Sequence, residues 1–138
     1  AGISTGVARG AFEKARAWCG ERVQGGKPLR EHQFTAAKLA EMAAKIDAAR
    51  LLYMYAANKV DNELPAPEYE PAAAKFFADR VAIEVADAAV SLVGARGYLR
   101  DHGVEKMLRD AYGARIYEGT PEVLALAITE CLYRADEL

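Results

Sequence analysis

The sequence predicts an all-α fold, an up-and-down four-helix bundle with an additional short helix. The first observation is an apolar stripe that recurs at steps of three and four residues, the spacing of one helix face. Its members are Leu39, Met42, Ile46, Ala49, Tyr53, Ala56 and Val60. The second is residues 71–96, where apolar side chains cover most of a helix circumference. The third is glycine and proline at residues 23–29 and 63–70, which divide the chain into helix-length pieces.

The composition predicts one ordinary soluble domain. Its 138 residues suffice for a sizeable core, and 52 % hydrophobic with 28 % charged residues is a typical balance. A net charge of −2 without a basic block argues against nucleic acid as a partner. No apolar run approaches the ~20 residues that span a bilayer. Cys19 and Cys131 lack metal-ligand spacing, so we interpret them as reduced packing residues of a cytosolic protein and expect no metal site.

Residues 1–22 predict a helix rich in glycine and alanine, with Ile3, Val7 and Trp18 as its larger contacts. Glycine weakens an isolated helix, so we expect these small residues to permit close approach of another helix or of a further domain. The chain begins without a helix cap or a methionine, which we interpret as a sign that it is part of a longer protein. Residues 23–29, with two glycines and a proline, predict a turn.

Residues 30–62 form the longest predicted helix, with the apolar stripe in the core. Its neighbouring Tyr53, Met54 and Tyr55 favour core or subunit contacts over a ligand patch. Residues 63–70 predict a solvated connection, because Pro65 and Pro67 oppose helix and the acidic side chains have no cation-loop spacing.

Residues 71–96 predict a third helix, central to the bundle, with one narrow polar stripe. It ends at the glycines of residues 94–98, where left-handed backbone is possible. A short helix is predicted for residues 101–112, closed by Gly113. The last helix spans residues 120–134, with Thr120 as its cap and Pro121 in its first position.

Glu118 is a candidate functional carboxylate on the short loop before this last helix. Burial beside Ile116 and Tyr117 would raise its pKa and suit it to act as a general base. The positive end of the following helix would oppose that rise by stabilising the anion. The pattern alone favours the simpler interpretation, a turn glutamate that faces water. Gly119 has no side chain, so a ligand could approach the backbone there.

Several motifs together resemble the acyl-CoA dehydrogenase family. I-Y-E-G-T-x-E at the Glu118 loop, preceded by V-E-K-M-L-R-D-A, resembles the C-terminal signature of that family. Further matches are G-E-R-V-Q-G-G-K-P-L-R-E-H-Q, K-L-A-E-M-A and A-V-S-L-V-G-A-R-G-Y, in the family's order and spanning nearly all of the chain. The resemblance implies that residues 1–138 are the C-terminal helical domain of a longer enzyme, without its N-terminal helical and middle β domains.

The resemblance also implies an activity, the α,β-dehydrogenation of an acyl-CoA thioester with FAD as cofactor, in fatty acid metabolism. Glu118 would be the catalytic base that removes the α-proton, and Tyr117 and Gly119 would bind the substrate. Thr120 and Glu122 would bind the phosphate and ribose region of the flavin. The isolated 138 residues are expected to be inactive.

The family's loops also imply contacts with the FAD of a neighbouring subunit. They would come from Arg22, Gln24, His32 and Gln33, and from Ser91, Gly94 and Ala95 near the end of the third helix. The sequence departs from the family at both loops. Gly25 stands where phenylalanine is usual, and Ser91, Val93 and Ala95 replace glutamine, phenylalanine and a glycine.

The partners implied by the resemblance are an acyl-CoA substrate, further copies in a homodimer or homotetramer, and an electron-transfer flavoprotein. The location would be the cytoplasm of a bacterium, or the mitochondrial matrix of a eukaryote. Two other functions stay open. The altered flavin loops favour a degenerate or split non-catalytic subunit, but the retained Glu118 argues against it. The same glutamate disfavours a flavin oxidase or monooxygenase on the same scaffold.

Overall fold

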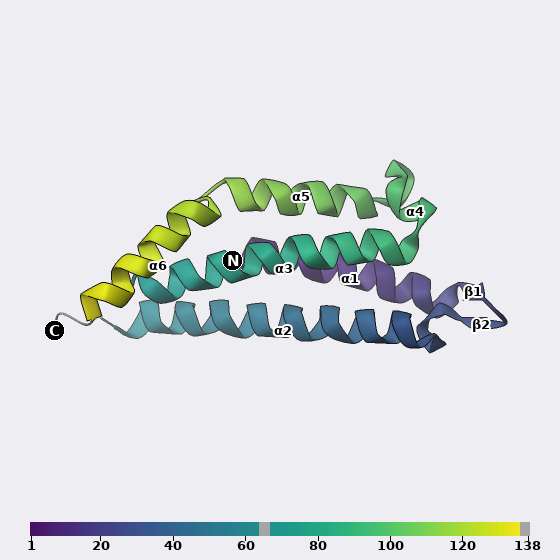
Figure 1. Ribbon diagram of the computed structural model, residues 1–138, viewed down its shortest axis with the longest axis horizontal. Helices are drawn as coiled ribbons and strands as arrows, with labels where there is room; N and C mark the ends of the chain where they lie inside the picture. The colour runs from purple at the N-terminus through teal and green to yellow at the C-terminus, as the bar shows by residue number, and fades with distance from the viewer. Residues whose placement is uncertain (64–66, 136–138) are drawn as a thin grey trace.

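The computed structural model describes residues 1–63 and 67–135 and confirms the predicted all-α bundle (Figure 1). The long helices are α1 (Gly2–Glu21), α2 (Gln33–Asn62), α3 (Tyr69–Val93), α5 (Val104–Ile116) and α6 (Pro121–Ala135). The connections hold β1 (Val23–Gln24), β2 (Lys27–Pro28), α4 (Ala95–Tyr98) and the 3₁₀ turns η1 (Leu29–Glu31) and η2 (Arg100–His102).

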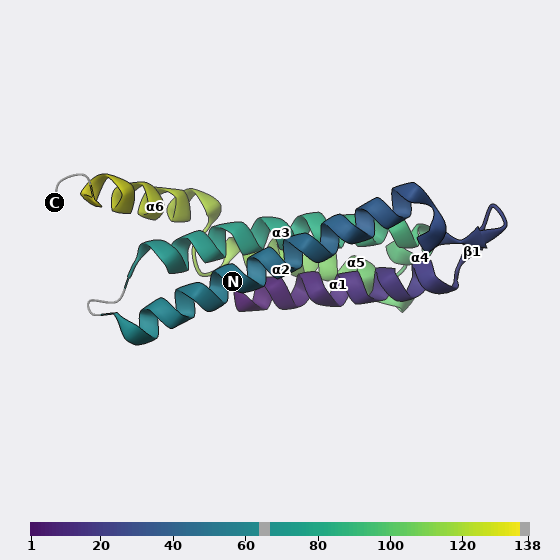
Figure 2. The ribbon, with the colours of Figure 1, turned by 90° about the horizontal axis from the view of Figure 1, so that it is seen from below.

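The central helix is α3, which contacts α1, α2, α5 and α6. Helices α1, α2 and α3 run along the length of the molecule, and α5 followed by α6 forms the fourth column (Figures 1 and 2). The chain bends between α5 and α6, so this column is broken at residues 117–120, the loop that carries Glu118.

Small side chains let α1 lie close against the central helix. Ala8, Ala11 and Ala15 of α1 are fully buried, as are Ala78 and Ala82 of α3. A side chain at Gly10 would lie 3.2 Å from Met107 on α5, so this position also keeps two helices close. The prediction that the glycine- and alanine-rich first helix permits close helix packing is confirmed.

The turn predicted for residues 23–29 is a small antiparallel hairpin. Val23 pairs with Pro28 and Gln24 with Lys27, and the two residues between them, Gly25 and Gly26, have φ angles of 58° and 79°. Two successive residues with positive φ are the requirement of the tight hairpin turn that matches strand twist.

The predicted bounds of two helices were wrong. Helix α3 ends at Val93 rather than at residue 96, because Gly94 with φ 70° and ψ −139° breaks it before the short α4. Helix α5 begins at Val104, and it continues through Gly113 to Ile116. A glycine inside a helix costs only about 1 kcal/mol. Burial of Ala111 and Ala114 on either side outweighs that cost.

One prediction about burial was wrong. Val60, the last member of the apolar stripe, is 43 % exposed, because it lies near the end of α2 beside an open hollow. In the opposite sense, Ser4 and Asp79 are polar side chains that the sequence did not mark as buried, and both are. Of the predicted solvated connection, residues 64–66 lie outside the described residues, and Tyr69 and Glu70 already belong to α3.

Neither a membrane helix nor a metal site is found in the described part of the chain. No helix there combines the length and the hydropathy needed to cross a bilayer. Across residues 1–63 and 67–135, no three His, Cys, Asp or Glu side chains are grouped to hold a metal ion.

Candidate functional site

The turn between α5 and α6 holds Glu118 in an unusual backbone conformation. Its φ angle is 58°, and it is the one non-glycine residue with positive φ in the described ranges. A left-handed conformation costs a residue with a side chain roughly 1–2 kcal/mol. Such strain persists where the surrounding structure imposes it, and it is concentrated at functional sites. Gly119 follows with φ 101°, where a side chain would be strained as well.

The surface around Glu118 is apolar but open in this chain. Glu118 itself is exposed, Ile116 is 69 % exposed and Tyr117 is 47 % exposed. Tyr112, one helical turn before Ile116, is 50 % exposed. The dry environment expected for a general base is therefore not supplied by the described residues. Apolar side chains gathered at a surface indicate a face that another group covers.

The start of α6 confirms part of the prediction, the proline in the first helical position, whereas the side-chain cap by Thr120 stays a prediction. Pro121 is the first helical residue, and the carbonyl of Thr120 accepts a 3.0 Å hydrogen bond from the Leu124 N–H. The Glu122 carboxylate accepts hydrogen bonds from its own backbone N–H and from the Thr120 hydroxyl, and these hold the pKa of Glu122 below its usual value. Glu122 thus serves as an anionic partner for the N-terminus of α6.

A second group of predicted residues lines a hollow at the hairpin end of the bundle. The hollow has a volume of about 430 Å³, within the usual range for ligand pockets. Its lining comprises Trp18, Arg22, Gln24, Leu29, Leu92, Val93, Ala95 and Arg96. The guanidinium of Arg96 lies 4.9 Å from the Trp18 ring centroid, and that of Arg22 lies 5.9 Å from it. The two guanidinium groups near one indole ring give this side of the hollow a positive charge and a flat aromatic surface.

The remaining predicted flavin contacts lie outside this lining. His32 donates a 2.9 Å hydrogen bond from Nε2 to the carbonyl of Gln24, so it supports the hairpin from the start of α2. Gln33 is exposed on the first turn of α2. Ser91 is also exposed and accepts a 3.3 Å hydrogen bond from Lys38. Gly94 makes the bend that separates α3 from α4.

The two groups do not meet within one chain. The Glu118 turn follows the C-terminal end of α5, whereas the hollow lies near α4, at the other end of α5 (Figure 1). With 13 residues in α5 and a rise of 1.5 Å per residue, that separation is about 20 Å.

Sequence reasoning missed three charged residues of these groups. Arg96 stands in the stretch G-A-R-G from Gly94 to Gly97, and that isolated positive charge was a signal that could have marked it. Lys75 and Asp79 are four residues apart in an apolar helix, the spacing of an ion pair on one helix face. Lys75 Nζ lies 5.8 Å from the Tyr117 ring centroid, so this pair belongs to the surroundings of Glu118.

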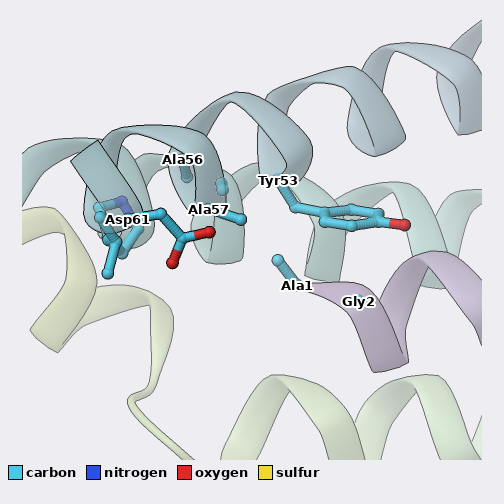
Figure 3. A pocket seen from close by; sticks show the side chains of 9 residues that line it. Ala1, Gly2, Tyr53, Ala56, Ala57 and Asp61 are labelled. Carbon is cyan, nitrogen blue, oxygen red and sulfur yellow. The ribbon is translucent and has the colours of Figure 1, made fainter.

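A second hollow, of about 390 Å³, contains none of the predicted site residues. It lies between the start of α1, the second half of α2 and the start of α3, and Tyr53 and Asp61 project toward it with Ala1 opposite (Figure 3). Ala56 and Ala57 of α2 and Ala74 of α3 contribute small side chains to the wall. Tyr53 therefore faces this hollow in part, where a core or subunit contact was predicted.

Comparison with known proteins gives consistent matches over nearly the whole chain. The family model of the acyl-CoA dehydrogenase C-terminal domain matches residues 1–133. The short-chain-specific acyl-CoA dehydrogenase of Clostridium acetobutylicum is 43 % identical over 129 residues, 94 % of this chain and 34 % of that protein. Subunit CarC of the caffeyl-CoA reductase–Etf complex of Acetobacterium woodii is 39 % identical over 131 residues, 95 % of this chain and 34 % of that protein.

A solved structure agrees with these sequence matches. The three-dimensional structure of butyryl-CoA dehydrogenase from Megasphaera elsdenii matches with a TM-score of 0.91 at 38 % identity, covering 94 % of this chain and 34 % of that one. The chain thus spans about one third of the length of the relatives it matches.

Proposed function

The chain belongs to the acyl-CoA dehydrogenase family, and we propose that it is the C-terminal helical domain of an FAD-dependent enzyme that dehydrogenates an acyl-CoA thioester. The observation that carries the proposal is the left-handed backbone of Glu118 in the turn between α5 and α6. This is the residue on which the resemblance places the catalytic base, and strain of this kind marks functional positions.

Glu118 would remove the α-proton of the substrate. A carboxylate is a weak base for a thioester α-carbon, so the thioester carbonyl must be polarised by hydrogen bonds and water must be excluded. The Glu118 N–H can supply one hydrogen bond, because no backbone acceptor for it occurs in the described ranges. The exposed Ile116 and Tyr117 would be covered by substrate, cofactor or another domain, and that cover would exclude water.

The residues of the hairpin-end hollow fit the adenosine diphosphate part of FAD. Arg22 and Arg96 present guanidinium groups, whose planar fork suits phosphate oxygens, and Trp18 backs them with an aromatic face. Gln24 adds an uncharged polar side chain to the wall, and the small Ala95 leaves room beside it. FAD, when bound, supplies the acceptor for the β-hydrogen as hydride. Thr120, at the start of α6, would contact the flavin of the same subunit through its hydroxyl group.

The separation of about 20 Å between the two groups supports an assembly in which each flavin lies between two subunits. One copy would offer the Glu118 turn and its partner the Arg22–Arg96 hollow, in a homodimer or homotetramer. An electron-transfer flavoprotein is the acceptor that we propose, since the relative CarC is a subunit of a reductase–Etf complex. The setting would be fatty acid metabolism in a bacterial cytoplasm or a mitochondrial matrix.

The test is Glu118→Gln in the full-length protein. We expect it to retain FAD and to lose the bleaching of flavin absorbance by acyl-CoA, by at least about 100-fold in rate, the contribution typical of a positioned base. Glu130→Gln is the matched control, an exposed glutamate of α6 that pairs with Arg134. Normal bleaching in Glu118→Gln would remove Glu118 from the reaction.

A non-catalytic subunit is the second candidate, and one observation favours it. Ser91, a residue of the predicted flavin loop, bonds Lys38 and does not line the hollow. Purified protein without flavin, unable to take up added FAD, would support this alternative over the enzyme. Rapid reoxidation of reduced flavin by air with release of peroxide would instead support the oxidase.

A further inference from the structure

Lys75 joins three helices near the Glu118 turn. Its ammonium donates hydrogen bonds to Asp79 Oδ2 at 2.5 Å and to the carbonyl of Ala114, in the last turn of α5, at 2.8 Å. The other oxygen of Asp79 accepts a 2.5 Å hydrogen bond from the Ser4 hydroxyl on α1. One cation on α3 thus connects α1, through Asp79, with the end of α5.

This ion pair is the least exposed one in the described ranges. The side chain of Lys75 is 12 % exposed and that of Asp79 is 2 % exposed. The comparable i,i+4 pair of Lys106 and Asp110 on α5 has exposures of 61 % and 42 %. Taking two charges out of water is costly, and apolar residues of similar volume often stabilise a fold as well or better. We therefore infer that this pair is kept because it holds the neighbouring helices in one specific arrangement.

The carbonyl of Ala114, which accepts the hydrogen bond from Lys75, lies where α5 ends and the Glu118 turn begins. In a continuous helix the carbonyl of Ala114 would accept from the N–H of the residue four positions later, Glu118. Helix α5 ends at Ile116, Glu118 turns to φ 58°, and the Ala114 carbonyl accepts from Lys75 instead. Lys75 thus replaces the Glu118 N–H as the partner of that carbonyl. A cation is also the favourable charge at a helix C-terminus.

Two consequences reach Glu118. Its N–H is left without a backbone acceptor in the described ranges, and it can donate to a ligand. Lys75 Nζ also lies 5.8 Å from the ring centroid of Tyr117, the residue before Glu118. The same cation therefore contacts the turn through this aromatic ring.

We propose that Lys75 is a positioning residue for Glu118. Lys75 donates a hydrogen bond to the Ala114 carbonyl at the end of α5. The turn can then hold Glu118 in the left-handed conformation, with its N–H free for the substrate. Asp79 and Ser4 orient the Lys75 ammonium for this task. The inference rests on the proposed function, because it concerns how the base is presented.

Lys75→Met tests the proposal in the full-length holoprotein. The substitution keeps the length of the side chain and removes its charge and donors. We expect FAD content to be retained, hydrogen exchange of backbone amides in residues 115–120 to accelerate, and the rate of flavin reduction by acyl-CoA to fall by about tenfold or more, as misplacement of a reacting group does. Lys75→Arg, which keeps a cation and donors, should recover part of the rate.

Two controls separate positioning from general stability. Lys106→Met removes the lysine of the matched surface pair and should change neither exchange at residues 115–120 nor the rate. Ile46→Ala weakens the core away from the turn, and its rate per folded holoenzyme should stay normal while its melting temperature falls. If Lys75→Met fails to fold, Lys75→Met/Asp79→Asn removes both charges, so that no unpaired buried carboxylate remains, and gives the same readouts.

Three results would overturn the proposal. One is a wild-type reduction rate in the folded Lys75 variants, even with faster exchange. Another is unchanged exchange at residues 115–120, and the third is an equal rate loss in Ile46→Ala. The Glu118→Gln result is read separately: normal reduction in that variant refutes the base itself, whereas loss of reduction there with normal reduction in Lys75→Met refutes only the role of Lys75.

Discussion

The Ser4 hydroxyl on α1 donates a 2.5 Å hydrogen bond to the Asp79 carboxylate on α3, and both residues are at most 2 % exposed. Because Lys75 occupies the other carboxylate oxygen, Asp79 is satisfied in a core formed otherwise by apolar side chains. The first helix and the central helix are therefore joined by a polar contact as well as by alanine packing.

Removal of that hydroxyl should destabilise the fold. Ser4→Ala leaves one oxygen of a buried charge without its donor, and we expect a loss of about 1–3 kcal/mol in the free energy of unfolding. Urea denaturation of the full-length protein, followed by far-UV circular dichroism, measures it. Ser91→Ala, which removes an exposed hydroxyl, should stay within about 0.5 kcal/mol of the wild type. Equal losses in the two variants would contradict the importance of the buried bond.

Gly119, beside the candidate base, and Gly113, inside α5, should respond to substitution in opposite ways. Gly119→Ala places a side chain at φ 101° and 3.3 Å from Leu124, so it should cost about 1–3 kcal/mol of stability. Gly113→Ala lies inside α5, where the new methyl group would meet only the Tyr117 ring at 4.0 Å, and should add up to about 1 kcal/mol. The same denaturation measurement checks both. Stabilisation by Gly119→Ala would be incompatible with the turn described.

The hairpin-end hollow predicts which arginines bind FAD. Arg96→Met or Arg22→Met should raise the FAD dissociation constant by roughly 10–100-fold, the value of one hydrogen bond to a charged group. Flavin fluorescence during titration of the apoprotein gives the constant. Arg100→Met, an exposed arginine of η2 that does not line the hollow, is the control. If Arg100→Met raises the FAD dissociation constant as much, the effect comes from overall charge and not from contacts in the hollow.

The Thr120–Glu122 contact predicts a dependence on pH. Hydrogen bonds from the Glu122 N–H and the Thr120 hydroxyl lower the pKa of Glu122 from its ordinary 4.5. A lowered folded-state pKa means that the contribution of this carboxylate to stability is present above pH 4.5 and is lost as pH falls through the folded pKa.

Thr120→Val should therefore raise the pKa of Glu122, because one of the two donors is gone. A carboxyl carbon NMR titration of Glu122 measures the change. Thr129→Val is the control, since the Thr129 hydroxyl bonds the Ala125 carbonyl within the same helix and leaves Glu122 untouched. An unchanged Glu122 titration in Thr120→Val would show that the hydroxyl does not contribute.

The helices could be predicted because apolar periodicity is a local property of the sequence. The residues at which two of the helices end could not be predicted in this way. Gly94 and Gly113 look alike in sequence, yet Gly94 breaks α3 with a positive φ and Gly113 continues α5. Burial of Ala111 and Ala114 makes the difference, and it depends on a partner helix that a local window does not contain.

Much of the candidate site could be found for the same local reason. Glu118, Gly119 and Thr120 are neighbours in the chain, and the helix start at Pro121 sets their place. Lys75 could not be found in this way, because 39 residues separate it from the Ala114 carbonyl that it holds. The charge of Arg96 was visible in the sequence, but its contact with Trp18 was not, because that contact depends on α4 folding against the end of α1.

Residue pattern alone was enough to establish a helical bundle, its breaks and the turn that carries Glu118, because each depends on neighbours within a few positions. Packing decided the rest: which glycine ends a helix, which charges are buried, and which cation meets the end of α5. Those outcomes depend on close contact between segments distant in the chain, where desolvation and steric fit act only after the helices have come together.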